Sequence, residues 1–378
     1  MNRETRSSQS SWQQSKNTQS SQQKRHSARR SASSSRSTPR RNNSSHGDQR
    51  GRYNRVRAQL QWGLLGCGQF AQKTVLPTFI RLRDQRVEGI YSHSYDHVKR
   101  IALRNRIPIY SSDPESIISN EKIKAVYITS RTSDHFSQAK AVIKAGKPLL
   151  IEKPMTVKSK DAAKLEKAAL KAQVPVMIGF CYRWYPPVQK AKETIVSGML
   201  GDIIDINITY CIDYPQEKHW TQINPQSAGG GVTMEIGTHC IDLIRYLGGE
   251  IEEVYGQRAS RFYKTDADDV MSAQFRLHSG TFARVLVSFQ SIGQTNDIII
   301  QGTKGYLVIP HFTRYRGESF LKGKDARHRI HERFRPVNIH QRMLIGFQRA
   351  LDNNEPMPVT PTDGRLNLQV IERIKKIK

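Results

Sequence analysis

The stretch LQWGLLGCGQFA, residues 60–71, indicates the fold more clearly than any other part of the sequence. A short apolar strand runs into Gly66 and Gly68, and a helical pattern follows from about Ala71. In such a G-x-G-x-x-A turn the first glycine permits the tight turn and the second lets backbone approach a pyrophosphate. The small alanine lets helix and strand pack closely, and the helix start offers free N–H groups. The stretch therefore predicts a dinucleotide site, with a glycine turn that binds nothing as the alternative.

The residues that follow continue the same architecture. Apolar, β-branched runs alternate with helical patterns of about a dozen residues, which is typical of βαβ units around a parallel sheet. The runs that we expect as strands are RVEGIYSHS, IKAVYITS, PLLIEKP and VPVMIGF. We assign residues 56–179 to a Rossmann-type, NAD(P)-binding α/β domain.

After Phe180 the pattern changes. One helical segment, VQKAKETIVSG, is followed by consecutive strand patterns joined by short Ser-Gly or Gly-Lys turns, which predicts an antiparallel sheet. A helical pattern, HQRMLIGFQRALDNN, lies near the end of the chain. We assign residues 180–378 to an α+β domain with a large, mostly antiparallel sheet.

Residues 1–55 have a different composition. They hold 13 Lys and Arg against two Asp and Glu, with almost no aliphatic residues, so we expect a disordered basic tail. Its cations could bind nucleic-acid phosphates weakly and without sequence preference, but few aromatic residues lie between them, and an extension with incidental binding is favoured. Its Arg- and Ser-rich character also overlaps with that of organelle transit peptides.

The whole chain carries a formal net charge of +27, so the folded part is basic as well. Its four cysteines show neither a zinc spacing nor a paired spacing, which fits free thiols in a reducing compartment. We see no apolar run as long as a membrane span and no secretory signal. A cytoplasmic protein is expected.

The end of the second predicted strand bears on the cofactor. An Asp or Glu there would bind the ribose 2′-hydroxyl of NAD, but the sequence has Ser92-His93-Ser94, with Lys99 and Arg100 shortly after. Hydroxyls and an imidazole can surround a 2′-phosphate. We therefore expect NADP in preference to NAD, although these serines could merely end a strand.

Glu152-Lys153-Pro154 ends another predicted strand, at the sheet edge where open α/β sheets bind ligands. A lysine there would lie beside the nicotinamide, where it could hydrogen-bond a substrate oxygen and help to move its proton. The Lys153–Pro154 bond is a candidate for the cis form. The alternative is an ordinary surface lysine before a turn.

The stretch GGGVTMEIGTHCIDLIRYLGG, residues 229–249, reads as an apolar helix with polar groups in line. Glu235 and His239 are four residues apart and share a helix face, which Asp242 and Tyr246 continue. Histidine titrates near neutrality and can act as base or acid, and a nearby carboxylate can orient its ring. A satisfied polar pair in the core is the alternative. We expect no metal, because the HExxH pattern is absent.

These segments, together with CYRWYPPVQKAKETIVSGMLGDI, resemble in order the signature segments of the Gfo/Idh/MocA oxidoreductases. The resemblance covers roughly residues 56–372. It implies a Rossmann domain followed by a second domain that binds substrate. The sheet of the second domain would form a homo-oligomer, either a dimer or a tetramer. The implied reaction is hydride transfer between a nicotinamide and a sugar, polyol or related compound.

The resemblance also implies site residues. His239, Lys153 and Glu235 would be catalytic, although the family usually has Asp at position 235. The cofactor would be bound by Gly66, Gly68, Gln69, Phe70, Ala71, Ser92, His93, Ser94, Thr129, Arg131, His135, Glu152 and Lys153. Candidate substrate contacts are Tyr182, Arg183, Tyr185 and Trp220, any of which could instead be core.

A second departure from the family pattern is Ser130-Arg131-Thr132, where Thr-Pro-Asn is usual. The two departures leave room for another function, a non-catalytic protein of the same fold. Such a protein would sense a dinucleotide or sugar and use the basic tail to bind a partner or nucleic acid. The presence of both Lys153 and His239 favours the enzyme, because a sensor would need neither.

Overall fold

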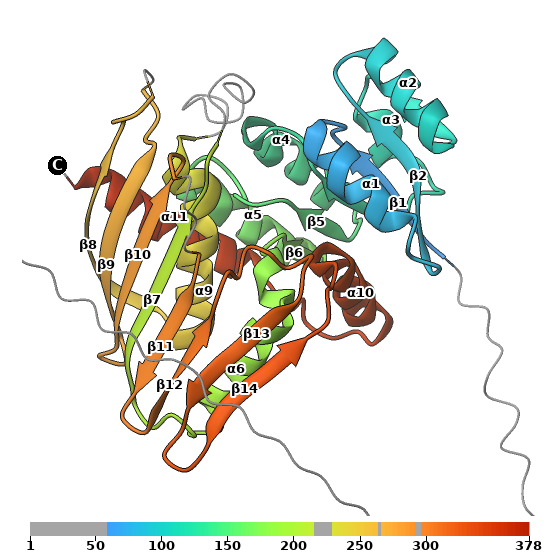
Figure 1. The fold of residues 1–378 in the computed structure, drawn as a ribbon. Coiled ribbons are helices and arrows are strands. Elements are labelled where there is room, and N and C mark those ends of the chain that lie inside the picture. Colours follow the sequence, from blue (N-terminus) through green and yellow to red (C-terminus); the bar gives the residue numbers. More distant parts are fainter. Residues whose placement is uncertain (1–58, 215–228, 264–265, 292–295, 378) are drawn as a thin grey trace, which may run out of the picture. The chain divides into compact units, whose positions relative to one another are not determined.

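The computed structural model describes residues 59–214, 229–263, 266–291 and 296–377 (Figure 1). Residues 1–55 and Trp220, both of which carry predictions, lie outside the described residues. The described residues form two sheets with helices against them.

The first sheet has six strands in the order β3-β2-β1-β4-β5-β6, and all its pairings are parallel. This is the strand order of a dinucleotide-binding Rossmann domain. β4, β5 and β6 are buried along their whole length, as are the later residues of β1 and β2, which explains why most strands read as continuous apolar runs. Their bounds are β1 Leu60–Leu65, β2 Gln85–Tyr91, β3 Ile109–Ser111, β4 Ala125–Ile128, β5 Leu149–Ile151 and β6 Val176–Ile178.

Helical segments connect these strands. The helix after the glycines begins with a π turn, η2 (Ala71–Val75), and continues as α1 (Leu76–Phe79). The others are α2 Tyr95–Asn105, α3 Glu115–Ile118, α4 Thr132–Lys144 and α5 Ser159–Ala172. The predicted parallel α/β unit is confirmed. Neither β3 nor α2 was predicted.

The second sheet has eight strands in the order β14-β13-β12-β11-β7-β10-β9-β8. Its pairings are antiparallel except for that of β10 with β7. A large, mostly antiparallel sheet is thus confirmed. The bounds are β7 Ile203–Cys211, β8 Ile251–Ala259, β9 Val270–Leu277, β10 Phe282–Ser288, β11 Ile298–Gly302, β12 Gly305–Ile309, β13 Ser319–Lys324 and β14 Arg329–Phe334.

Helices pack on one face of this sheet (Figure 1). The predicted helix of residues 229–249 comprises a π turn, η5 (Thr233–Gly237), and α9 (Thr238–Gly248), which lies against β7 and β10. A short 3₁₀ turn, η3 (Cys181–Trp184), and α6 (Pro186–Val196) connect the two sheets.

The last two helices return to the first sheet. In α10 (Ile339–Asp352), Phe347 packs against Trp62 of β1, with ring centroids 4.8 Å apart. α11 (Pro361–Lys376) packs against α5 and β6 as well as α9. The C-terminal segment therefore stabilises the dinucleotide-type unit, although the sequence suggested only a helix beyond the second sheet.

Candidate active site

The glycine turn leaves room for a ligand beside its backbone. Gly66 has a φ of +113° and lies so close to strand β4 that an added Cβ would come within 2.5 Å of Ser130 N. The side chain of Thr129 donates a hydrogen bond to the Gly66 carbonyl, at 2.8 Å. At Gly68, by contrast, an added Cβ would meet no protein atom within 4 Å. Ala71 is fully buried between helix and strand. The turn thus fits a pyrophosphate, which Gly68, Gln69 and Phe70 would hold with their backbone.

The residues after β2 present polar groups at the same sheet edge. Ser94 caps α2 by accepting a hydrogen bond from His97 N, and Ser92 lies against Cys67 of the glycine turn. The exposed His93 ring bonds the Tyr91 hydroxyl at 2.8 Å and Asp134 at 3.2 Å. These groups fit the adenosine end of a dinucleotide.

Two residues expected at the cofactor differ in exposure. Arg131 is exposed and precedes α4. His135 is almost completely buried, and its ring nitrogens lie 2.9 Å from the Pro154 carbonyl and 3.3 Å from the Ser130 carbonyl. These contacts join the loops after β4 and β5, and they favour a supporting position for His135 over direct contact with a cofactor.

Glu152 lies beneath the end of β5. It is 8% exposed, accepts a hydrogen bond from the buried Tyr127 hydroxyl, and accepts another from the backbone N–H of Lys153 at 3.2 Å. Burial raises the pKa of Glu152 to about 7, against the opposing effects of Tyr127 and Lys153. The Lys153–Pro154 bond is cis, as predicted.

Lys153 joins the two halves of the site. Its ammonium donates to the Glu235 carbonyl oxygen at 2.9 Å and to the Glu235 carboxylate at 3.1 Å. The lysine side chain is only 12% exposed, whereas that of Glu235 is 38% exposed. An ammonium has three donors, and contacts with the described residues use two of them, so one remains for another acceptor. A strand end of the first sheet thus meets the start of the helix that lies on the second sheet.

His239 lies one turn beyond this contact and is 8% exposed. Its Nδ1 has no hydrogen-bond partner among the described residues. Burial, together with the positive charge of Lys153, holds the pKa of His239 well below its ordinary value, so the ring is neutral at pH 7. The sequence led us to expect that Glu235 orients this ring. The structure pairs Glu235 with Lys153 instead.

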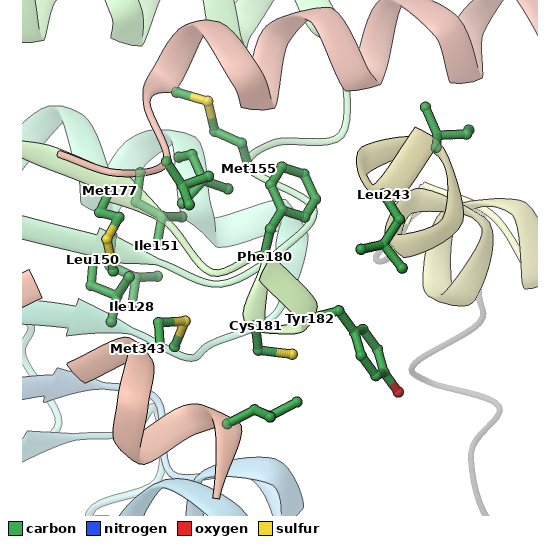
Figure 2. Close-up of a cluster of buried hydrophobic side chains, with 14 of the residues drawn as sticks. Ile128, Leu150, Ile151, Met155, Met177, Phe180, Cys181, Tyr182, Leu243 and Met343 are labelled. Atoms are coloured by element: carbon green, nitrogen blue, oxygen red, sulfur yellow. The ribbon is translucent and has the colours of Figure 1, made fainter. Parts of the chain in front are cut away.

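One aromatic ring, that of Tyr182, meets the His239 imidazole, and further aromatic rings pack around Tyr182. Figure 2 shows Phe180, Cys181 and Tyr182 at the start of η3, just after β6, with the Tyr182 ring turned away from Met177. The Tyr182 ring meets His239 edge-on at 5.0 Å, and its hydroxyl lies 3.2 Å from that of Tyr210. Around Tyr182 lie Tyr210, Phe312 and Tyr315, with ring centroids 5.3–6.1 Å from its own. We call Tyr182, Tyr210, Phe312 and Tyr315 the aromatic wall.

Arg183, expected at the substrate, has other partners. Its guanidinium donates to both Asp242 oxygens, at 2.6–3.1 Å, and to Asp363 at 2.9 Å. It also packs on the Tyr246 ring at 5.2 Å. The stripe on α9 therefore divides, because His239 faces the aromatic wall while Asp242 and Tyr246 hold Arg183. These contacts favour a structural role for Arg183.

Tyr185 is fully buried, and its hydroxyl lies near Ser319 of β13. None of its contacts with described residues joins it to Lys153 or His239. This placement favours a core position, the alternative left open for each of these aromatics.

Four residues near Lys153 and His239 were missed from the sequence. Three of them lie in or just after segments in which the residues form no recognisable motif, namely Phe312, Tyr315 and His340. Tyr210 was detectable, because it continues the inward-facing alternation of Ile206 and Ile208 on β7. His340, at the start of α10, lies edge-on to Phe70 at 5.6 Å.

Comparison with known proteins identifies both units. A model described as "Oxidoreductase family, NAD-binding Rossmann fold" matches residues 60–180, and one described as "GFO/IDH/MocA C-terminal domain" matches residues 188–308. The chain is 25% identical to a D-xylose 1-dehydrogenase (NADP(+)) of Haloferax volcanii over 318 residues, which is 83% of this chain and 96% of that protein.

Solved structures share the fold. An aldose-aldose oxidoreductase from Caulobacter crescentus, complexed with glycerol, superimposes with a TM-score of 0.77 at 24% identity, covering 84% of this chain and 97% of that one. A levoglucosan dehydrogenase in complex with NADH and levoglucosan gives 0.76 at 22% identity, covering 84% and 96%. At these identities the likeness establishes the architecture alone.

Proposed function

The chain belongs to the Gfo/Idh/MocA family of oxidoreductases, and on that premise we propose that it transfers hydride between NADP and a sugar, polyol or related hydroxyl or carbonyl compound. The observation that carries the proposal is the contact of Lys153 with Glu235, one turn before a neutral, buried His239. Strand β5 and the helix of the second unit together supply these groups.

Lys153, His239 and Glu235 have distinct roles in this mechanism. The free donor of Lys153 binds the substrate oxygen and stabilises negative charge on it. His239, neutral because of its burial, accepts the hydroxyl proton during oxidation and returns it during reduction. Glu235 fixes the lysine ammonium by two hydrogen bonds. The nicotinamide, when bound, accepts or supplies the hydride.

The aromatic wall supports a sugar-like substrate. Aromatic faces provide apolar contact for the C–H groups of a ring, while the hydroxyls of Tyr182 and Tyr210 offer hydrogen bonds. D-xylose is the substrate named for the Haloferax volcanii relative. A panel of aldoses and polyols, monitored by nicotinamide absorbance, tests the substrate class. Turnover of a panel member supports the proposal, and absence of turnover with every member despite tight cofactor binding would favour a sensor.

The preference for NADP over NAD rests on Ser92, His93 and Ser94. Their hydroxyls and imidazole, with Lys99 and Arg100 on α2, would contact a 2′-phosphate. Energy transfer from tryptophan to NADPH and to NADH gives the two dissociation constants directly. Tighter binding of NADPH supports the preference, and tighter binding of NADH overturns it without affecting the mechanism.

We assign a homo-oligomer to the outer face of the large sheet, opposite the helices. That face exposes Tyr255, Phe282, Leu286 and Tyr306, each at least 41% exposed.

The four cysteines are free and buried, which suits a reducing compartment and supports a cytoplasmic location. Among the described residues no helix has the length and apolarity needed to cross a membrane. Weak binding of nucleic acid by residues 1–55 remains a separate proposal.

A further inference from the structure

His340 is a buried imidazole that the mechanism above does not use. It is 6% exposed, and its Nδ1 has no hydrogen-bond partner among the described residues. Its position is fixed, because Asn338 accepts hydrogen bonds from the backbone N–H groups of His340 and Gln341. Asn338 also donates to Thr78 of α1 at 2.9 Å. A buried polar atom without a partner is costly unless a ligand supplies one.

The groups around His340 come from both sides of the site. Phe70, from the glycine turn, meets its ring edge-on at 5.6 Å, and Tyr315 of the aromatic wall does so at 6.2 Å. Burial, with the charges of Arg316 and Lys153, lowers the pKa of His340 to about 4. The ring is therefore neutral at pH 7 and has one N–H donor and one acceptor.

The position of His340 corresponds to the nicotinamide half of a bound dinucleotide. Phe70 follows Gly68, where the pyrophosphate would bind, and Lys153 lies two residues after β5, where hydride transfer would occur. The nicotinamide half of the cofactor spans this interval in a Rossmann domain. Its carboxamide carries both a carbonyl acceptor and an NH₂ donor, so it matches either tautomer of a neutral imidazole.

We infer that the His340 imidazole hydrogen-bonds the nicotinamide carboxamide and so fixes the rotation of the ring. The inference rests on the proposed function. It makes His340 a positioning residue for the cofactor, whereas His239, beside Tyr182, stays free for the substrate.

The test compares two ligands that differ only in the nicotinamide. NADPH and 2′-phospho-ADP-ribose are each titrated against the full-length protein by calorimetry, with wild type, His340→Phe and His340→Asn. The phenylalanine keeps the ring contacts with Phe70 and Tyr315 but has no nitrogen, and the asparagine amide can replace Nδ1. His278→Phe, at an exposed position, is the matched control.

We expect His340→Phe to weaken NADPH binding about tenfold, the effect of one lost hydrogen bond, without changing the affinity for 2′-phospho-ADP-ribose. His340→Asn should restore most of the loss, and His278→Phe should match wild type. Equal weakening of both ligands, or an unchanged NADPH affinity, would overturn the inference. Failure of wild type to bind either ligand would instead contradict the proposed function.

Discussion

Lys153 lies where the two halves of the site meet, and its surroundings show what a motif can and cannot predict. The position of Lys153 at a strand end followed from its sequence, because parallel strands present their carboxyl ends at one edge. The partner of the Glu235 carboxylate could not be predicted from the sequence. Helical spacing placed Glu235 beside His239, but the ammonium that donates to its carboxylate is that of Lys153, just after β5 and 82 residues earlier.

The buried carboxyl of Glu152 gives a pH dependence to stability. Because its pKa rises from 4.5 to about 7 on folding, the folded protein binds the proton more tightly than the unfolded chain. The contribution of Glu152 to the free energy of unfolding is therefore most favourable below pH 4.5 and declines as the pH rises towards 7. The loss is on the order of 3 kcal/mol at most. Glu152→Gln, which keeps an acceptor for Tyr127, should remove this decline.

Thermal unfolding of wild type and Glu152→Gln from about pH 5 to about pH 8 measures this decline in stability. The two midpoints should diverge with rising pH, the variant becoming relatively more stable. Glu121→Gln, at an exposed position, should follow wild type throughout. A constant difference between wild type and Glu152→Gln would show that Glu152 does not titrate in this range.

At the scale of elements, the two glycines of the turn have different roles, because Gly66 is needed for the fold and Gly68 for cofactor binding. Gly66→Ala forces a side chain into a φ of +113° and against Ser130, and should destabilise the fold by roughly 1–3 kcal/mol or more. Gly68→Ala meets no protein atom, so its unfolding midpoint should match wild type. Its methyl group would occupy the place of the pyrophosphate, and NADPH affinity should fall about tenfold or more.

Both variants are compared by thermal unfolding and by NADPH titration. We expect Gly68→Ala to lose affinity for NADPH while keeping its stability. If Gly68→Ala bound NADPH as tightly as wild type, the pyrophosphate would lie elsewhere and the turn would be structural.

The ion-pair cluster of Arg183 holds three elements together, η3, α9 and α11. Asp242 is 1% exposed, so Arg183→Met would leave its carboxylate buried without its main partner, at a cost of about 3–5 kcal/mol. Arg333→Met breaks an exposed pair with Glu318 and should leave the free energy of unfolding close to that of wild type. Urea unfolding compares the two variants. Similar, small losses would contradict a structural role for Arg183.

Two further elements that the sequence failed to predict, strands β13 and β14, share a physical cause. β13 and β14 alternate charged residues with few apolar ones, because one face of each meets solvent and β14 is an edge strand. Their strand conformation depends on pairing with β12, which local sequence does not encode. For the same reason the return of α10 to the first sheet, which brings His340 beside Phe70, could not be predicted.

For the whole molecule, the exposed sheet face predicts self-association. Phe282→Glu, at a residue 59% exposed on that face at the start of β10, should dissociate the oligomer because it would bury a carboxylate in the interface. Leu170→Glu, at a residue 80% exposed on α5, is the control and should leave the oligomer intact. Light scattering after size exclusion gives the masses. A monomeric wild type, or an unchanged mass for Phe282→Glu, would contradict this assignment.

In the proposed reaction Lys153 and His239 carry out the proton transfer that accompanies hydride transfer. The most direct measurement is the turnover number of wild type, Lys153→Ala and His239→Ala with the best substrate of the panel, alongside the NADPH dissociation constant of each. We predict a loss of about 10²–10⁴-fold in turnover for both variants, with NADPH affinity within a few-fold of wild type. Wild-type turnover in both variants would contradict the account.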